Sequence, residues 1–236
     1  GNDFLPLTVI LNEMISHAET AQKMVGKLAL LTASKSAGNV VSIKRKDWSH
    51  LRDLAHSIAS RQGKKVEIVT SGLNDYDLPD NYQQTISAIS VQFIRNAVTH
   101  GIETPHDRSQ AQKTETGEIS IRLLRRETGA MQFVFEDDGG GLNINGLRKR
   151  ALDSGLLNEL QAESMDRKQV MALIFSPNLS TYDSADEDAG RGVGMSAVKE
   201  SINALGGKIT IANRPGYGCK FTVTFPPVPE LKALIA

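Results

Sequence analysis

Three polar side chains at helical spacing, Gln92, Asn96 and His100, could carry chemistry in this chain. Residues at i, i+4 and i+8 share one face of an α-helix. An amide oxygen such as that of Asn96 is a hard, neutral ligand suited to Mg²⁺, which keeps waters and substrate phosphates in its shell. The stripe therefore indicates a metal and phosphate site, although a solvated helix face has the same pattern.

A second candidate site follows a predicted strand, where Asp137 precedes the run Asp138-Gly139-Gly140-Gly141. A carboxylate at a strand terminus can accept a hydrogen bond from an exocyclic amine such as N6 of adenine. Glycines allow a base to approach the backbone closely. Taken alone, the run reads equally well as a turn that contains aspartates.

A third candidate site is the run Gly190-Arg191-Gly192-Val193-Gly194-Met195 before a predicted helix. Unhindered N–H groups and the positive end of the helix dipole favour phosphate there. Neither a Rossmann βαβ unit nor a Gly-Lys-Ser/Thr phosphate loop surrounds this run. In their order along the chain, the three sites together predict a pocket for adenine, a divalent metal and phosphates.

The elements that must position these sites are helices and strands that are not regularly interleaved. The expected helices span 47–62, 81–100, 145–155, 167–175 and 193–205, and the expected strands span 65–70, 118–126, 131–136, 208–213 and 220–225. Glu127-Thr128-Gly129 is a natural turn, so the second and third strands should form an antiparallel hairpin. The pattern predicts an α+β two-layer sandwich, with helices on one face of a mixed, mostly antiparallel sheet. Residues 176–190 are polar and read as a mobile loop that could close as a lid.

The first 45 residues form a separate segment in this interpretation, and residues 46–236 form the domain that carries the site. Apolar residues from Leu7 to Leu28 repeat at alternating spacings of four and three, which is a heptad seam. This seam is compatible with a homodimer through the helix, and also with an amphipathic helix packed on its own domain. The chain begins at Gly1, so we expect it to be a piece of a longer protein.

Composition narrows the classes of function. The chain has 27 basic and 27 acidic residues, which argues against broad binding to nucleic acid. It has no continuous apolar run of membrane-spanning length, so direct membrane insertion is not expected. Cys219 is the single cysteine, which excludes an internal disulfide and fits a cytoplasmic location.

These motifs resemble the GHKL (Bergerat-fold) ATPase superfamily and, within it, the catalytic domain of chemotaxis-type (CheA-like) histidine kinases. The matching runs are 93–98 with 100–103, 137–142, 173–177 with 180–181, 190–195, and 216–218 with 221–226. The resemblance covers roughly 47–227. It implies a Bergerat ATP-binding fold, with ATP and Mg²⁺ as cofactors.

The resemblance also implies roles for individual residues. Asn96 is similar to the metal-ligating asparagine, and Asp137 to the aspartate that reads adenine. His100 and Arg150 stand where the family places groups near the phosphates, and Phe175 resembles the lid phenylalanine. The expected catalytic residues are Gln92, Asn96 and His100. The expected nucleotide-binding residues are Asn96, His100, Asp137, Gly139, Gly141, Arg150, Phe175, Ser180, Thr181, Gly190, Gly192, Val193, Gly194 and Met195.

The implied function is transfer of the γ-phosphoryl group of ATP to a histidine on a separate phosphotransfer domain, which then serves a response regulator in a phosphorelay. Gln92 departs from the family, where histidine is usual in these kinases and glutamate in the hydrolytic members. Glutamine cannot take a proton at neutral pH. Two alternatives therefore stay open: a nucleotide-binding pseudokinase that regulates a partner, and an ATPase that hydrolyses ATP.

Overall fold

A five-stranded mixed sheet forms the centre of the fold in the computed structural model, which describes residues 47–176, 179 and 194–227. The strands are β1 (Val66–Ser71), β2 (Gly117–Arg125), β3 (Ala130–Asp137), β4 (Lys208–Arg214) and β5 (Gly218–Pro227). Their spatial order is β1-β2-β3-β5-β4. Only the β1–β2 pair is parallel, so the prediction of a mostly antiparallel mixed sheet is confirmed.

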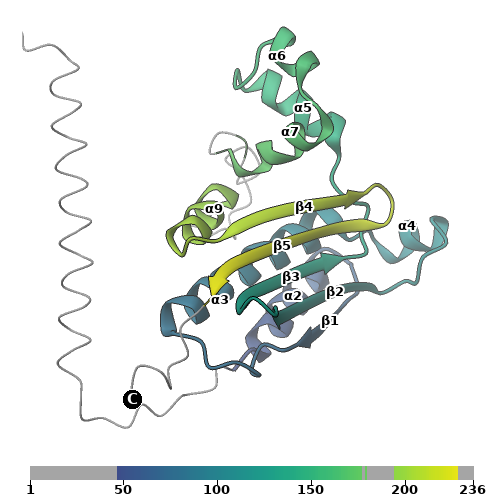
Figure 1. Ribbon diagram of the computed structural model, residues 1–236. Helices are drawn as coiled ribbons and strands as arrows, with labels where there is room; N and C mark the ends of the chain where they lie inside the picture. The colour runs from purple at the N-terminus through teal and green to yellow at the C-terminus, as the bar shows by residue number, and fades with distance from the viewer. Residues whose placement is uncertain (1–46, 177–178, 180–193, 228–236) are drawn as a thin grey trace, which may run out of the picture. The chain divides into compact units, whose positions relative to one another are not determined.

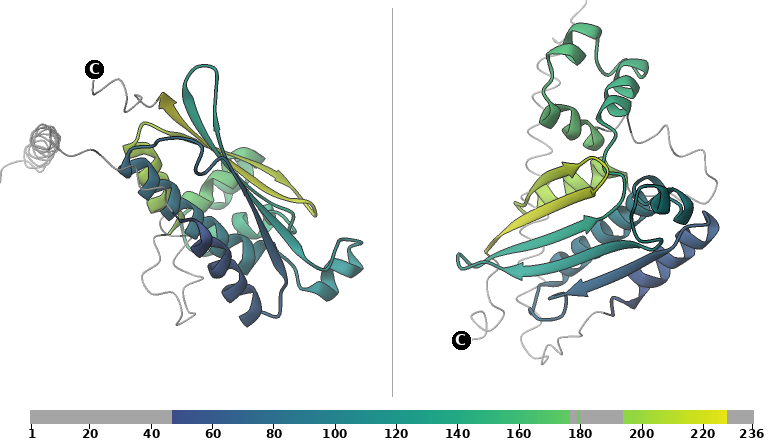
Figure 2. Two further views of the ribbon diagram at one scale, coloured as in Figure 1. Left: turned by 90° about the horizontal axis from the view of Figure 1, so that it is seen from below. Right: turned by 90° about the vertical axis from the view of Figure 1, so that its right-hand side faces the viewer.

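One face of this sheet is covered by helices α2 (Ser49–Arg61), α3 (Asp80–Asn96) and α9 (Met195–Ala204), as Figures 1 and 2 show. Alternation along the strands explains the layering, because every second side chain points to the helices. In β2, for example, Ile119, Ile121 and Leu123 are buried. On the open face, Arg122 and Lys220 form exposed ion pairs with Glu136. The predicted two-layer sandwich is therefore observed.

Aromatic rings join the central helix to the sheet. Phe93 of α3 stacks on Phe221 of β5 with ring centroids 4.5 Å apart, and it meets Phe135 of β3 edge-on at 5.3 Å. Phe93 and Phe135 are at most 1% exposed. These contacts fix the carboxyl end of α3 over the middle strands, where the candidate site lies.

A smaller lobe projects beyond the β4 edge of the sheet (Figure 1). It consists of α5 (Ile144–Asp153), α6 (Glu159–Ser164), α7 (Arg167–Ala172) and the 3₁₀ turn η2 (Leu173–Phe175). Leu147, Ala151 and Val170 are the centre of its own apolar cluster. Both α6 and α7 begin with a capping box, which satisfies the free N–H groups of such short helices. None of the described helices is long and apolar enough to span a membrane.

Two features differ from the sequence-based expectations. The helix predicted over 81–100 ends as α-helix at Asn96 and continues as the π-helical turn η1 (Ala97–Gly101). The Lys64 ammonium donates to the carbonyls of Val98 (2.6 Å) and Thr99 (2.8 Å), and so satisfies acceptors that the wider turn leaves open. The short helices α4 (Pro105–Gln110) and α6 were not predicted, because six residues are too few for a periodic pattern.

The chain divides into two units, Gly1–Lys44 and Arg45–Ala236, and the first lies wholly outside the described residues. The predicted heptad helix falls within it. The loop predicted over 176–190 falls almost entirely outside the described residues as well. Both therefore stay predictions.

The aromatic contacts of Phe93 give a stability prediction. Phe93→Ala should lower the free energy of unfolding by about 3–5 kcal/mol, because it removes a fully buried ring and leaves a cavity. Leu124→Ala, on an exposed side chain of β2, is the matched control and should cost less than about 1 kcal/mol. Urea denaturation of both variants measures the difference; equal losses would contradict the role given to Phe93.

Candidate functional site

Asn96 is the last residue of α3, where the helix meets the candidate site. Its side-chain oxygen accepts a hydrogen bond of 3.3 Å from the amide of Gln92, one turn earlier. Both side chains are half-buried. The stripe predicted from their spacing is therefore present for these two residues, and Gln92 orients the amide of Asn96.

His100 lies in the π turn rather than in the α-helix, and it is exposed. A π turn advances by fewer degrees per residue than an α-helix, because its hydrogen bonds join residues five apart. His100 follows Asn96 by four residues, which is close to one turn of either helix type, so the π turn alone does not move it to another face. A hydrogen bond joins Gln92 and Asn96, whereas the place of His100 on the same face stays a prediction.

Asp137 closes β3, and its side chain is buried, with 6% exposed. One carboxylate oxygen accepts the N–H of Gly139 at 3.0 Å, and the carboxylate also accepts the backbone N–H of Cys219. Burial raises the pKa of Asp137 from its ordinary value of 3.8 to about 6, against the opposing effect of these two bonds. A buried carboxylate of this kind gains from a ligand that donates a hydrogen bond.

The ends of the helix and the strand meet through their glycines. The N–H of Gly140 donates to the carbonyl of Gly101 at 2.9 Å. A methyl group added at Gly101 would lie 3.4 Å from Oδ1 of Asp137, so the carboxylate faces the π turn. The structure thus places the first two candidate sites side by side, although about forty residues separate them in the chain.

The segment that follows Asp137, residues 138–141, is called the Asp137 loop, and its own packing accounts for its glycines. A Cβ at Gly139 would lie 2.3 Å from the carbonyl oxygen of Gly101, and one at Gly141 would lie 2.6 Å from Oδ1 of Asn213. Gly141 also has φ +77°, which favours glycine. The role expected for these glycines is to let a base approach the backbone closely. Their contacts show that packing of the loop against its neighbours already requires them.

The third glycine run is described only at its end. Gly194 precedes the first residue of α9, and Met195 is buried in the main core. Helix α9 packs against α3, so its amino terminus belongs to the same side of the sheet as Asn96. The predicted residues Ser180, Thr181, Gly190, Gly192 and Val193 lie outside the described residues.

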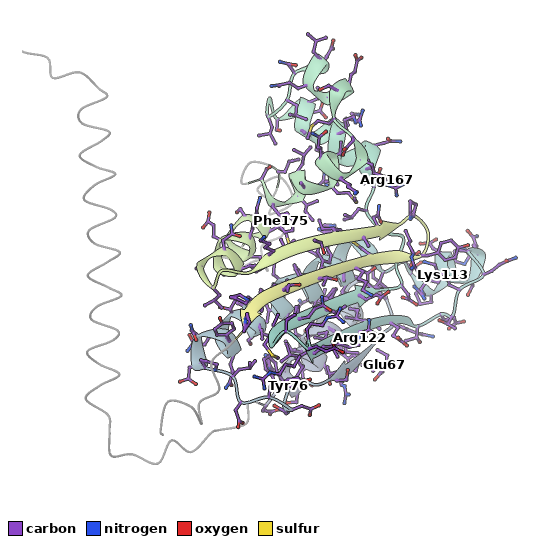
Figure 3. All side chains as sticks on the ribbon, in the orientation of Figure 1. Glu67, Tyr76, Lys113, Arg122, Arg167 and Phe175 are labelled. Carbon is purple, nitrogen blue, oxygen red and sulfur yellow. The ribbon has the colours of Figure 1, made fainter. Side chains whose placement is uncertain are left out.

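Two further predicted residues lie on the smaller lobe. Phe175 (labelled in Figure 3) is 8% exposed and packs into the main core. The Lys199 ammonium lies 5.9 Å from the centre of its ring. Arg150 is an exposed residue of α5. In the described part of the chain, no three His, Cys, Asp or Glu side chains gather as a metal site. A metal here would take the Asn96 oxygen and ligands from a substrate, as Mg²⁺ does with phosphates.

An ion-pair cluster around a buried arginine, beside the Asp137 loop, was not predicted from the sequence. The side chain of Arg108 is only 1% exposed. Its guanidinium binds both carboxylate oxygens of Asp138, at 3.1 and 2.7 Å. It also binds Glu103 at 3.1 Å, and its Nε donates to the carbonyl of Thr114. Arg108 comes from the short helix α4, so no periodic pattern marked it.

Lys113 completes this cluster. Its ammonium binds Glu103 at 2.7 Å and donates to the backbone carbonyls of Asp138 (2.8 Å) and Gly139 (2.9 Å). The cluster of Glu103, Arg108, Lys113 and Asp138 therefore holds the backbone that directly follows Asp137. It fixes the position of the loop, and no ligand contact needs to be assumed for it.

The ion-pair cluster around Arg108 leads to a prediction about stability. Arg108→Met should destabilise the protein by about 1–3 kcal/mol, because the hydrogen bonds of the buried guanidinium to Asp138, Glu103 and Thr114 are lost. Lys113 stays paired with Glu103, and Asp138 is 41% exposed, which limits the loss. Lys65→Met is the matched control, since the Lys65–Glu115 pair is more than half exposed and should contribute less than about 1 kcal/mol. Urea denaturation tests both, and a small loss for Arg108→Met would refute the structural role.

Comparison with known proteins agrees with the resemblance seen in the motifs. The sequence profile described as "Histidine kinase-, DNA gyrase B-, and HSP90-like ATPase" matches residues 85–229. The chemotaxis protein CheA of Bacillus subtilis (strain 168) is 30% identical over 91% of this chain and 31% of its own length. That of Rhizobium meliloti (strain 1021) is 36% identical over 76% of this chain and 23% of its own.

Among solved structures, the histidine kinase domain of the blue-light activated kinase of Erythrobacter litoralis covers 81% of this chain and 66% of its own, with 14% identity and a TM-score of 0.42. The chain spans less than a third of the length of the two chemotaxis proteins. The profile match covers more than half of the chain and includes both Asn96 and Asp137. The chain therefore belongs to the family of histidine kinase-, DNA gyrase B- and HSP90-like ATPases.

Proposed function

We propose that this chain is the ATP-binding catalytic domain of a two-component histidine kinase of the chemotaxis type. Its reaction is transfer of the γ-phosphoryl group of ATP to a histidine on a separate phosphotransfer domain. The observation that carries the proposal is the apposition of the Asp137 carboxylate and the end of α3, joined by the bond from Gly140 to Gly101. The kinship with chemotaxis proteins supports the choice of a histidine as acceptor.

The residues present fit a nucleotide. Asp137 offers a buried acceptor to the amino group of adenine, and that bond would offset part of its desolvation. Asn96 offers the oxygen ligand for Mg²⁺, whose role is to neutralise charge on the phosphates. Gly192, Gly194 and the amino terminus of α9 would receive the phosphates, with His100 and Arg150 near them.

The protein's part in the reaction is positioning. The bond between the γ-phosphorus and the bridging oxygen of ADP breaks as a bond from an imidazole nitrogen to phosphorus forms. Such transfers need alignment and charge neutralisation more than a protein base. Gln92 suits this requirement, because it orients Asn96 by a hydrogen bond and does not activate water.

The partners follow from the same proposal. A phosphotransfer domain supplies the acceptor histidine, and a response regulator receives the phosphoryl group from it. We propose a cytoplasmic location, where ATP is present and Cys219 stays reduced. Residues 1–45 would supply a homodimer contact through their heptad seam.

The decisive experiment is phosphoryl transfer from ATP labelled at the γ-phosphate. We expect label on a phosphotransfer domain encoded in the parent protein or its operon, dependent on Mg²⁺. Tight nucleotide binding without transfer to any such domain would replace the proposal by that of a regulatory pseudokinase.

Asn96→Ala gives the test of the metal assignment. The variant should lose at least about tenfold in Mg²⁺-dependent affinity for ATP, because an oxygen ligand and its orienting bond disappear together. Calorimetry with and without Mg²⁺ measures this. Asn203→Ala, an exposed residue near the carboxyl end of α9, is the control and should bind as the parent does. Unchanged Mg²⁺ dependence in Asn96→Ala would sink the assignment.

Asp137 predicts a pH dependence for binding of the base. Its carboxyl ionises as pH rises through about 6, so its capacity to accept a hydrogen bond from adenine increases over that range. Affinity for adenosine, which carries no phosphate, should therefore fall by up to about tenfold for each pH unit below 6. Asp137→Asn should abolish this pH dependence and weaken the preference for adenosine over guanosine. An unchanged profile in the variant would refute the role.

Gln92→Glu separates kinase from hydrolase. If the native glutamine withholds a base from water, the glutamate variant should hydrolyse ATP at least about tenfold faster than the parent. Phosphate release measures the rate, and Gln92→Met controls for loss of the bond to Asn96. If the parent chain hydrolyses ATP rapidly and the Gln92→Glu variant does so at the same rate, the result would instead favour an ATPase.

A further inference from the structure

A hollow lies beside the Asp137 loop. Its volume is about 500 Å³, and its walls come from the loop after β3, the first turns of α5, the start of α7 and the turn between β4 and β5. Neither Asn96 nor Asp137 lines it. Of the described residues assigned to the nucleotide, Gly141 alone lines it.

The charged side chains that line this hollow are all positive. Arg148 of α5 and Arg167 of α7 line it, and its other lining residues include no aspartate or glutamate. Within the described residues, neither arginine forms an ion pair. Figure 3 shows Arg167 at the base of the smaller lobe, on the side toward the β4–β5 turn.

Arg148 is held in place but incompletely satisfied. One of its terminal nitrogens donates to the carbonyl of Met165 at 3.0 Å, whereas its Nε is buried and has no hydrogen-bond partner. A buried donor without a partner is unfavourable, and a charged donor more so. The side chain is therefore pre-positioned while part of its hydrogen-bonding capacity is unused.

The orientation of α5 separates this hollow from the expected phosphate contacts. Arg148 and Arg150 are two residues apart, which is about 200° around an α-helix. They lie on nearly opposite sides of α5, and Arg150 is absent from the lining of the hollow. A ligand of Arg148 would therefore not be the phosphate group expected near Arg150.

We propose that this hollow is a second binding site, specific for an oxyanion, that is, a carboxylate or phosphate group. Two guanidinium groups present planar forks that suit such groups, and the site contains no competing acid. The amide of Asn145, from the first turn of α5, adds a neutral polar group to the same wall. The oxyanion has two possible sources, which are an acidic side chain of a protein segment and a small free anion.

The test uses the complete 236-residue chain and observes the Nε–H signal of Arg148 by NMR, assigned through its loss in Arg148→Lys. Inorganic phosphate and a hexaglutamate peptide are the probes. Both should shift the signal in a saturable manner, and Arg167→Gln should weaken this binding by about tenfold. Lys168→Gln, an exposed neighbour that does not line the hollow, should change it by less than about twofold.

The two probes identify the source. Peptide binding that is tighter than phosphate binding by more than about tenfold points to an acidic protein segment, and equal or weaker peptide binding points to a small anion. The proposal is overturned if neither probe moves the Arg148 signal, or if Lys168→Gln weakens binding as much as Arg167→Gln. It is also overturned if Arg167→Gln weakens binding of MgATP to the same extent, since the hollow would then belong to the nucleotide site.

Discussion

The buried guanidinium of Arg108 is the contact on which the geometry of the site depends. It joins Asp138, which follows the end of β3, to Glu103, which follows the π turn, and Lys113 binds the carbonyls of Asp138 and Gly139. The side chain of Arg108 is 1% exposed, and removing such a charge from water is costly unless hydrogen bonds and opposite charges compensate it. The same pairing keeps the Asp137 carboxylate facing Gly101.

The aromatic core supplies the rest of the framework. Phe93 locks α3 onto β3 and β5, so the end of the helix cannot slide along the sheet without breaking its packing. The core also reaches Asp137, and its burial raises the pKa of that carboxyl to about 6. Stability and chemistry thus share one constraint, because the packing that fixes the strand end also removes the carboxylate from water.

Local patterns predicted most of the elements but not all of their ends. The alternation in β2 and β3 and the turn at Gly129 predicted the antiparallel hairpin, in which the structure pairs Ile121 with Phe135. The π turn after Asn96 was not foreseen, because it depends on the Lys64 ammonium reaching carbonyls 34 and 35 residues away. Helix α4 was also missed, although it carries the arginine that organises the site.

By itself the sequence determined the residue types, their order and the family, because these are properties of the chain: an amide in a helix, a carboxylate before glycines, and a glycine run before a helix. The tertiary structure decided which of them meet. It brought Gly101 against Gly140, gave the loop glycines a packing role, and gathered Arg148 and Arg167 around one hollow. Such contacts arise from strand order and lobe packing, and no local periodicity encodes the distance between residues far apart in the chain.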